Sequence, residues 1–464
     1  MSAHTAGEPS CPPAVGTVME GDNVSAAPID RTDPVHDIIG IGFGPSNLAL
    51  AVAVDEHNRT APGDERLDAV FLDRQSRFGW HRGMLIEGTT MQVSFLKDLA
   101  TTRNPASDFT FLSYLHERGR LVDFINHKAM FPSRVEYHDY LEWAAARLDH
   151  LVRYDSEVVG VEAGADGVFE VLVRQGSGEL VLRRARNVVI AVGLEASVPD
   201  GAELGPRVWH NLDLMHRVGE LDPAEPRRFT VIGAGQSAAE VTDYLHRTFT
   251  RAEVCSVFSR YGHTPADDSP FANRIFDPRA VDDFYAAPGE VKRMLMDYHR
   301  NTNYSVVDLD LIEELYARCY QEKVRGECRL RMLNASRAVE VRPGPDGVRV
   351  TVEFLPTGER TVLDSDVLVY ATGCRPGDPL RLLGDLGGHC ERDEEGRLRV
   401  ERDYRLRTDD GVPGGIYLQG ATEHTHGITS SLLSNGAVRA GEIRDSVLAR
   451  RTAPVVRDYA LSGS

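Results

Sequence analysis

Two glycine-rich turns carry the clearest chemical signal in this chain. The first reads Gly40-Ile-Gly42-Phe-Gly44-Pro45 and the second Gly233-Ala-Gly235-Gln236-Ser237, each after an apolar stretch. Glycines between a strand and a helix let backbone N–H groups and a helix N-terminus approach a pyrophosphate. One such turn is a weak signal, and two ordinary α/β turns without a ligand are the alternative. Two in one chain favour two bound dinucleotides, most simply a flavin and a nicotinamide.

The position of the third glycine is occupied differently in the two turns. Ala238 stands there in the second turn, and alanine still allows a helix to pack closely on its strand. Asn47 stands there in the first turn and is bulkier. Either the first helix stands off from its strand, or the amide of Asn47 is used.

The residues that end the next strand of each unit distinguish the two dinucleotides. Asp73 follows the apolar run Ala69–Leu72, where a carboxylate would accept hydrogen bonds from ribose hydroxyls. A helix cap or a solvated turn is the alternative for Asp73. In the second unit the strand Glu253–Phe258 leads to Arg260, a basic residue that suits a 2′-phosphate and favours NADPH over NADH. Arg260 could also be a plain surface arginine.

Apolar patterns predict the elements that position these turns. We expect a strand over Ile38–Ile41, a helix from Pro45 to about His57, and an amphipathic helix over Tyr137–Leu148. Alternating residues predict a small antiparallel unit of three strands, over Glu157–Val161, Phe169–Val173 and Glu179–Arg183. A separate apolar strand is expected over Asn187–Val192. The later strands are Val348–Phe354, Val367–Tyr370 and Ile416–Gln419. Thr372 and Gly373 follow the second of these, where we expect the chain to return toward the flavin.

These elements predict an α/β protein with two Rossmann-like dinucleotide-binding domains and a smaller substrate-binding region. Residues 33–212 form the first part of the FAD domain, and 213–365 form the NADPH domain with an insertion of few strands near 265–308. Residues 366–450 return to the FAD and substrate domain, and residues 1–32 and 451–464 are tails.

Composition excludes several classes of protein. The net charge of -18 argues against nucleic acid and anionic membranes as partners, and no apolar run is long enough to span a bilayer. The six cysteines form no CxxC pair and no metal-ligand spacing, which excludes dithiol reductases and predicts no metal site. Free thiols fit a reducing, cytoplasmic setting.

Several strings together resemble the N-hydroxylating flavoprotein monooxygenases that act on L-ornithine and L-lysine. The resemblance covers about Asp37 to Arg444. The matching strings are Gly42-Phe-Gly-Pro-Ser-Asn-Leu-Ala, Trp80-His81-Arg-Gly-Met84, Met91-Gln92-Val-Ser-Phe-Leu-Lys97-Asp-Leu-Ala-Thr, Phe131-Pro-Ser-Arg134, Gly233-Ala-Gly-Gln-Ser-Ala, Ala266-Asp-Asp-Ser-Pro-Phe-Ala-Asn273, Asn301-Thr-Asn303-Tyr-Ser-Val-Val and His424-Thr-His-Gly-Ile-Thr-Ser-Ser431-Leu-Leu-Ser434. The Thr-Asn-Tyr-Ser-Val-Val string is similar to the ornithine branch.

The resemblance implies FAD and NADPH as cofactors, and hydroxylation of the side-chain amine of L-ornithine by O₂ through a hydroperoxyflavin. It implies that the product feeds a siderophore or another secondary metabolite, and that the protein is a homotetramer or homodimer. Two departures stand out: Cys374 occupies a position where the family has Tyr, and Asn211-Leu212 replaces a Ser-Ser pair.

Four residues carried over from the matching strings would bind the substrate. Lys97 is the expected partner of its carboxylate, although a surface ion pair with Asp98 is the alternative. Asn273 is the expected catalytic residue, because an amide can orient the neutral amine without trapping it as ammonium. Asn303 and Ser431 complete the site.

The same carry-over names the cofactor contacts. Trp80, His81 and Gln92 are expected at the flavin. Gln236 and Ser237 are expected at the NADPH pyrophosphate and ribose, and Arg134 at a phosphate.

Three other activities stay open at this point. One extra methylene changes binding by only about 1–3 kcal/mol, so L-lysine or a diamine are alternative substrates. An uncoupled NADPH oxidase is the third alternative, and it would yield only peroxide.

Overall fold

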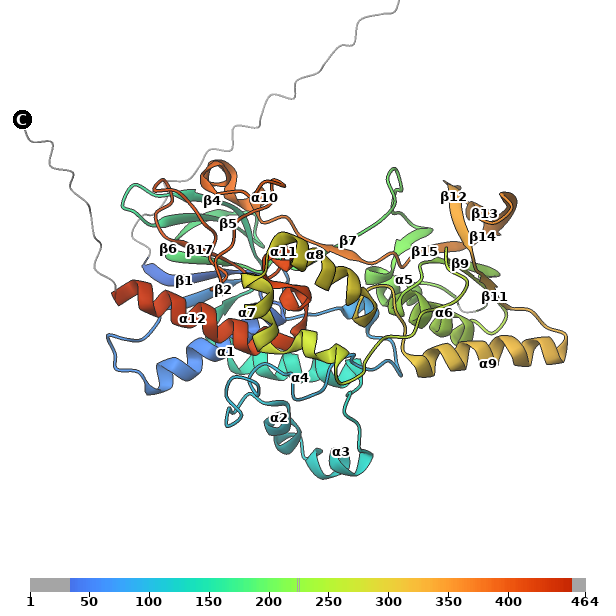
Figure 1. The fold of residues 1–464 in the computed structure, drawn as a ribbon, viewed down its shortest axis with the longest axis horizontal. Helices are drawn as coiled ribbons and strands as arrows, with labels where there is room; N and C mark the ends of the chain where they lie inside the picture. Colours follow the sequence, from blue (N-terminus) through green and yellow to red (C-terminus); the bar gives the residue numbers. More distant parts are fainter. Residues whose placement is uncertain (1–33, 223, 225, 453–464) are drawn as a thin grey trace, which may run out of the picture.

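The computed structural model describes residues 34–222, 224 and 226–452. The expected tails therefore lie outside the described residues, except that residues 451–452 end the last helix. Two halves, each built around its own sheet, lie side by side (Figure 1).

The sheet of the first half has the order β3-β2-β1-β6-β5-β4, and β17 also pairs with β6. Its strands are β1 (Val35–Ile41), β2 (Ala69–Leu72), β3 (Val152–Arg153), β4 (Ser156–Ala163), β5 (Phe169–Gln175), β6 (Leu180–Ile190) and β17 (Gly415–Leu418). One prediction was wrong here: Glu179–Arg183 and Asn187–Val192 are not separate strands, because most of both ranges lies in the single continuous strand β6. The first part of β6 pairs antiparallel with β5, and its last part pairs parallel with β1 and β17.

Helices from both ends of the chain cover this sheet. The helices α1 (Pro45–Thr60) and α12 (Gly436–Thr452) pack on each other, and α4 (Arg134–Arg147) lies beside α1. The short helices α2 (Phe111–Glu117) and α3 (Leu121–His127) extend below α4 in Figure 1. Buried aromatic rings on α2 and α4, including Phe111, Tyr137 and Tyr140, fill the space between them.

The second half contains a parallel sheet of order β11-β10-β9-β15-β8. Its strands are β8 (Val208–His210), β9 (Arg228–Ile232), β10 (Glu253–Val257), β11 (Leu330–Leu333) and β15 (Val367–Tyr370). Both β8 and β15 lie outside the expected 213–365 segment. Parallel pairing with β9 places β15 in this sheet, and β15 in turn holds β8. The helices here are α5 (Leu214–Val218), α6 (Gln236–Thr248) and α9 (Leu309–Arg325), and a small sheet contains β12 (Ser336–Pro343), β13 (Val348–Phe354) and β14 (Glu359–Ser365).

The chain passes between the halves twice, through the antiparallel pair β7 (Leu194–Ala196) and β16 (Cys374–Pro376). The single-turn helices η1 (Arg82–Met84) and η3 (Asn211–Asp213) also meet at this boundary. The remaining helices after β16 are α10 (Leu380–Leu383), η6 (Gly384–His389), α11 (Glu423–His426), η7 (Ile428–Ser431) and η8 (Leu433–Asn435).

The insertion folds back onto the first half. It contains η4 (Ala272–Phe276), α7 (Pro278–Ala286), α8 (Gly289–Tyr298) and η5 (Arg300–Thr302), and its described residues form no named strand. Helix η4 packs on η7, and α7 packs on α11. Residues near 270 and near 430 are therefore brought together (Figure 1).

Candidate active site

The first glycine turn has the shape of a phosphate cradle. Gly42 has φ +83°, and a Cβ there would lie 2.4 Å from the carbonyl oxygen of Ala191. A Cβ at Gly44 would meet nothing within 4 Å, so that side of the turn is open. Helix α1 begins at Pro45 without a side-chain cap, which leaves N–H groups of its first turn to bind an anion. These residues fit a dinucleotide pyrophosphate.

Asn47 resolves the question of the missing third glycine. Its side chain is fully buried, its Nδ2 donates to the carbonyl of Gly42 at 2.7 Å, and its Oδ1 accepts from Nε2 of Gln419 at 2.8 Å. The amide thus connects the glycine turn to Gln419, which directly follows β17 in the same half.

Asp73 lies against the same turn. Its Oδ2 accepts from the N–H of Phe43 at 2.6 Å, and its Oδ1 accepts from the N–H of Gln75 at 2.8 Å. This buried carboxylate shapes the loop around the expected ribose position. The structure thus places Asp73 beside Gly42 and Gly44 and leaves its ribose contact a prediction.

The second turn repeats the arrangement in the other half. Gly233 has φ +153°, and a Cβ there would lie 2.2 Å from the carbonyl oxygen of Ala371. Helix α6 has Gly235 as its N-cap and lacks a side-chain cap, so the N–H groups of Gln236 and Ser237 open its first turn. These backbone donors fit the second pyrophosphate. The side chain of Gln236 points elsewhere, because its amide bonds Asp308 and Glu240.

Two residues expected at cofactors are held in contacts that cross between the halves. Arg134 forms a bidentate ion pair with the buried Glu240 of α6, at 2.7 and 2.9 Å, and also donates to the carbonyl of Met84. This pairing leaves the phosphate role of Arg134 without support. Gln92 donates from Nε2 to Oδ2 of Asp308 at 2.5 Å.

Trp80 and His81 lie where the first half meets η1. The Trp80 ring packs on Tyr137, with centroids 6.3 Å apart, and on His81 at 4.7 Å. His81 adopts a left-handed backbone with φ +48° and precedes η1. Burial, and secondarily the charge of Arg134, lowers the pKa of His81 to about 4, so the ring is neutral at physiological pH.

Arg260, Thr372 and Gly373 lie at the carboxyl end of the second sheet. Arg260 is exposed after β10, and its Nη1 donates to the carbonyl of Ser305 at 2.8 Å. Thr372 donates to the carbonyl of Ser197, and the Gly373 carbonyl accepts from the N–H of Ser197 at 3.0 Å. The Ala-Thr-Gly segment thus fastens the two chain crossings together.

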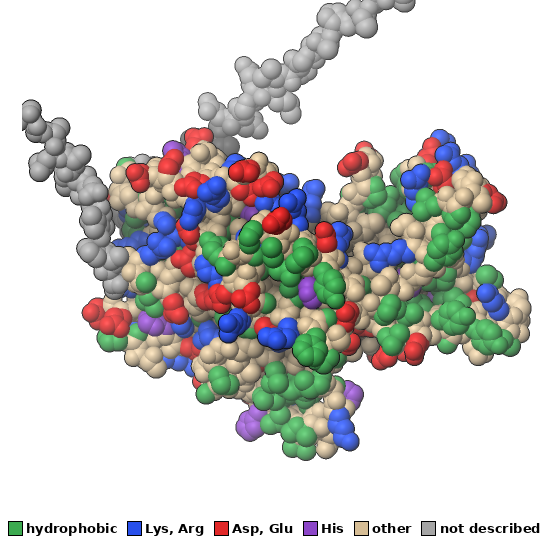
Figure 2. Space-filling view, in the orientation of Figure 1, with side chains coloured by type: hydrophobic (Ala, Val, Ile, Leu, Met, Phe, Trp, Pro, Cys, Tyr) green, Lys and Arg blue, Asp and Glu red, His purple; other side chains and the backbone are tan. Residues whose placement is uncertain are grey.

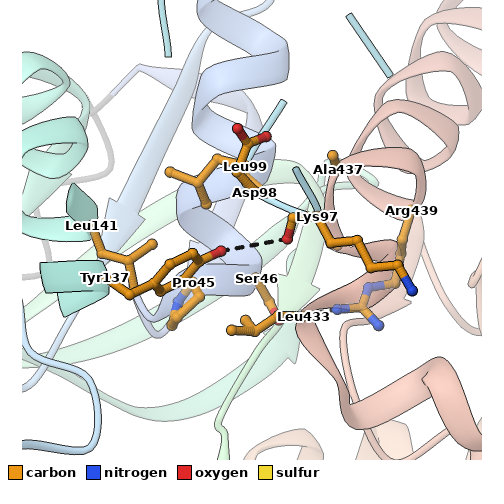
Figure 3. A pocket seen from close by; sticks show the side chains of 12 residues that line it. Pro45, Ser46, Lys97, Asp98, Leu99, Tyr137, Leu141, Leu433, Ala437 and Arg439 are labelled. Carbon is orange, nitrogen blue, oxygen red and sulfur yellow. Dashed lines mark hydrogen bonds between the residues drawn. The ribbon is translucent and has the colours of Figure 1, made fainter. Parts of the chain in front are cut away.

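Lys97 lines a small cavity between α1, α4 and α12 (Figure 3). Its neighbour Asp98 turns inward instead and accepts from the N–H groups of Ala100, Thr101 and Phe111. Among the residues that the structure describes, Lys97 has no ion pair within 4 Å, and its ammonium lies 5.5 Å from the centroid of the Phe276 ring of η4. Burial lowers the pKa of Lys97, while Asp277 opposes this effect. The surface ion pair with Asp98 is therefore absent from this structure, and the role of Lys97 at the substrate carboxylate stays a prediction.

Asn273 is on η4, the same short helix as Phe276. Its Nδ2 donates to the carbonyl of Asp268 at 2.8 Å, which fixes the orientation of the amide. The Oδ1 atom is then the acceptor that can serve a ligand. Ser431 ends η7, which packs on η4. Asn303 follows η5, and its neighbour Tyr304 hydrogen-bonds Glu423 of α11. The structure thus brings together the elements that carry all four expected substrate residues.

Two residues of this region had no signal in the sequence. Arg439 on α12 is only 3% exposed, and its guanidinium donates to the Ser430 carbonyl at 2.6 Å and to Oγ of Ser46 at 3.2 Å. It ties the start of α1 to η7, one residue before Ser431. Asp308 joins Gln92 to Gln236. The Arg439–Ser46 and Gln92–Asp308 contacts join residues far apart in sequence, and no local pattern records them.

The fold contains two sheets, and in each a strand is followed by a glycine turn and a helix without a side-chain cap. The chain connects the two halves through β7 and β16. This arrangement defines a two-dinucleotide oxidoreductase. The family described as L-lysine 6-monooxygenase/L-ornithine 5-monooxygenase matches residues 34–376. The chain belongs to this family.

Individual relatives extend the match to nearly the whole chain. The L-ornithine N(5)-monooxygenase of Burkholderia cepacia is 42% identical, over 86% of this chain and 91% of its own. The ornithine N-hydroxylase of Kutzneria sp. 744, with reduced FAD, NADP⁺ and L-ornithine, is 47% identical with a TM-score of 0.87, over 90% of this chain and all of its own. The L-lysine 6-monooxygenase of Pseudomonas syringae is 32% identical with a TM-score of 0.79, over 90% of this chain and all of its own. The predicted family and the fold of two Rossmann-like sheets are confirmed.

Proposed function

We propose that this protein is an L-ornithine N(5)-monooxygenase that uses FAD, NADPH and O₂. The observation that carries the choice of substrate is the identity of the relatives: ornithine enzymes match this chain at 33% to 47%, and the lysine enzyme matches at 32%. The cavity chemistry agrees, since a half-buried lysine with no described carboxylate within ion-pair distance suits an amino-acid carboxylate.

The residues of the site have separate tasks in this proposal. Lys97 binds the substrate carboxylate, and Asn303 and Ser431 complete the binding of the amino-acid end. Oδ1 of Asn273 accepts a hydrogen bond from the side-chain amine and aims its nitrogen at the flavin. FAD, once reduced by NADPH, supplies the activation of O₂.

The protonation state of the substrate explains the choice of an amide. An alkyl ammonium has a pKa of about 10.4, so roughly one molecule in 250 is neutral at pH 8. A carboxylate beside the amine would favour the unreactive ammonium, whereas an amide oxygen orients the neutral amine without adding charge. Burial of the site lowers the cost of keeping the amine neutral.

Product analysis tests the proposal. Purified protein with FAD, NADPH and O₂ is supplied with L-ornithine, L-lysine or putrescine, and hydroxylamine and peroxide are both measured. Hydroxylamine from L-ornithine at a rate well above the other two amines is the expected result. A preference for L-lysine or putrescine would reassign the substrate, and NADPH consumption with peroxide alone would make the protein an oxidase.

We also propose a cellular compartment for the enzyme and a use for its product. We expect a cytoplasmic enzyme that feeds N-hydroxyornithine into a siderophore or another secondary metabolite, and the five described cysteines are all unpaired. None of the described helices is both long and apolar enough to cross a bilayer.

A homo-oligomer is the expected assembly. Apolar side chains gather over α3 and the segment after it (Figure 2), where Val122, Ile125, Met130, Phe131 and Val135 are exposed. Sedimentation of the protein measures the state, and a monomer at micromolar concentration would contradict it.

A further inference from the structure

One carboxylate contacts the two glutamines that the sequence assigns to different cofactors. Oδ2 of Asp308 accepts from Nε2 of Gln92 at 2.5 Å and from Nε2 of Gln236 at 3.1 Å. The backbone N–H of Asp308 also donates to Oε1 of Gln236 at 2.8 Å. Gln92 belongs to the flavin half, and Gln236 opens the helix of the second glycine turn. Asp308 therefore joins the two expected cofactor sites.

The place of Asp308 in the fold makes this contact unusual. It is the N-cap of α9, where an aspartate side chain ordinarily accepts from the first turn of its own helix. Its side chain makes no such cap hydrogen bond. The carboxylate is instead directed away from its helix and across the boundary between the halves.

A second crossing contact supports the first. Nε2 of Gln236 also donates to Oε1 of Glu240 at 3.1 Å, and Glu240 holds Arg134 of α4 in the bidentate pair. Both ends of this polar bridge, Gln92 and Arg134, lie in the first half, and its three middle residues lie in the second. The bridge fixes the first turn of α6 relative to the flavin half.

The surroundings of Asp308 explain how the bridge is held. Burial raises the pKa of Asp308, and the nearby charges of Glu240 and Asp310 act in the same direction. The hydrogen bonds from Gln92 and Gln236 oppose this rise. The two amides are thus what makes this carboxylate tolerable at a half-buried position.

We propose that Asp308 is a positioning residue whose carboxylate oxygen orients the amides of Gln92 and Gln236 together, and so sets how the NADPH-binding turn faces the flavin site. The proposal rests on the proposed function only in taking FAD and NADPH as the ligands of the two turns. The acceptor oxygen is the essential feature, because both glutamines donate to it.

Three variants separate this role from helix capping and from charge. Asp308→Ser keeps a good helix cap but is too short to reach both glutamines. Asp308→Asn keeps one acceptor oxygen and loses the charge. Asp310→Asn is the matched control, because it removes the same charge from an exposed position one half-turn along α9.

Two measurements on the FAD-bound protein test the proposal without substrate. Hydrogen exchange is followed in residues 89–97 and in the first turn of α6, and the Kd for NADP⁺ is measured by titration. We expect Asp308→Ser to speed exchange in both segments about fivefold and to raise the Kd about tenfold, the size of one or two lost hydrogen bonds. Asp308→Asn and Asp310→Asn should stay within about threefold of the parent for both measurements.

Two outcomes would overturn the proposal. Parent-like exchange and Kd in Asp308→Ser would show that the bridge positions nothing. A loss in Asp308→Asn as large as in Asp308→Ser would show that charge, not the acceptor, matters, and this variant decides the question if Asp308→Ser does not fold. Failure of the parent to bind NADP⁺ would count against the cofactors instead, and the exchange comparison would still judge Asp308.

Discussion

In the proposed function, Lys97 is the residue on which substrate binding depends most directly. We expect Lys97→Ala to raise the KM for L-ornithine at least about tenfold, since a charge-assisted contact is worth about 1.5–3 kcal/mol. NADPH oxidation should persist, because Lys97 is not one of the residues expected to bind either cofactor, and its ammonium lies near the Phe276 ring of the insertion. Steady-state kinetics with both readouts measures the split. Lys323→Ala, an exposed lysine on α9, is the control, and an unchanged KM in Lys97→Ala would remove Lys97 from the site.

Asn273 offers a sharper test, because replacing its amide with a carboxylate adds a negative charge and leaves the shape of the side chain nearly unchanged. Asn273→Asp should lower kcat about tenfold or more at pH 8, since a carboxylate beside the amine stabilises the unreactive ammonium. The pH at which the rate rises should move upward for the same reason. Hydroxylamine formation against pH measures both. Asn301→Asp, at an exposed position in the middle of η5, adds the same charge as a control. A parent-like pH profile in Asn273→Asp would place the amine elsewhere.

Among the elements, α4 and α6 are joined by the buried pair of Arg134 and Glu240, of which Glu240 is only 4% exposed. Arg134→Met leaves an uncompensated carboxylate, so we expect a loss of about 3–5 kcal/mol in the free energy of unfolding. Arg134→Met with Glu240→Leu should recover most of this loss, because no buried charge then remains. Denaturant unfolding of these two variants and of Glu240→Leu alone measures the three losses. Additive losses in the double variant would mean that the two side chains are not coupled.

The elements that the sequence predicts well are those with local causes. The strand β2 has the predicted bounds, and α1 and α6 begin at the glycine turns because these turns admit few other conformations. The continuous β6 was missed because its two parts pair with different strands, which changes its burial pattern along its length. Strand β8 was missed in the second sheet because a three-residue strand has no readable period.

The site residues also divide into those that local sequence predicts and those that depend on long-range contacts. The elements of Lys97, Asn273 and Ser431 come together as expected, because the matching strings had already grouped them. The partners of Arg134 and Gln92 were not predictable, since each lies more than 100 positions away in the chain. Long-range polar pairs leave no trace in local composition, so the sequence alone does not distinguish an arginine that pairs within the protein from one that contacts a ligand.

At the scale of the whole molecule, buried histidines make stability depend on pH. Burial lowers the pKa of His81 to about 4 and of His426 to about 3, and it also lowers the pKa of His210, His246 and His263. The unfolded chain binds a proton at each near pH 6.5, whereas the folded chain does not. Stability therefore rises with pH through this range, is full above about pH 6.5, and is lost as the pH falls toward 4.

We expect the free energy of unfolding of the FAD-bound protein, measured by denaturant unfolding at intervals of pH, to fall with a steep slope between pH 6.5 and pH 4. A single histidine whose pKa falls from 6.5 to about 4 contributes a loss of about 3 kcal/mol over that range. His426 stacks on Tyr404 and bonds the Arg402 carbonyl, so His426→Gln should lower stability at pH 7 yet make the slope shallower by about one proton. His150→Gln, at an exposed position in the short helix after α4, should leave the slope unchanged. Stability that is flat down to pH 5, or a slope that His426→Gln does not alter, would mean that these rings titrate freely in the folded protein.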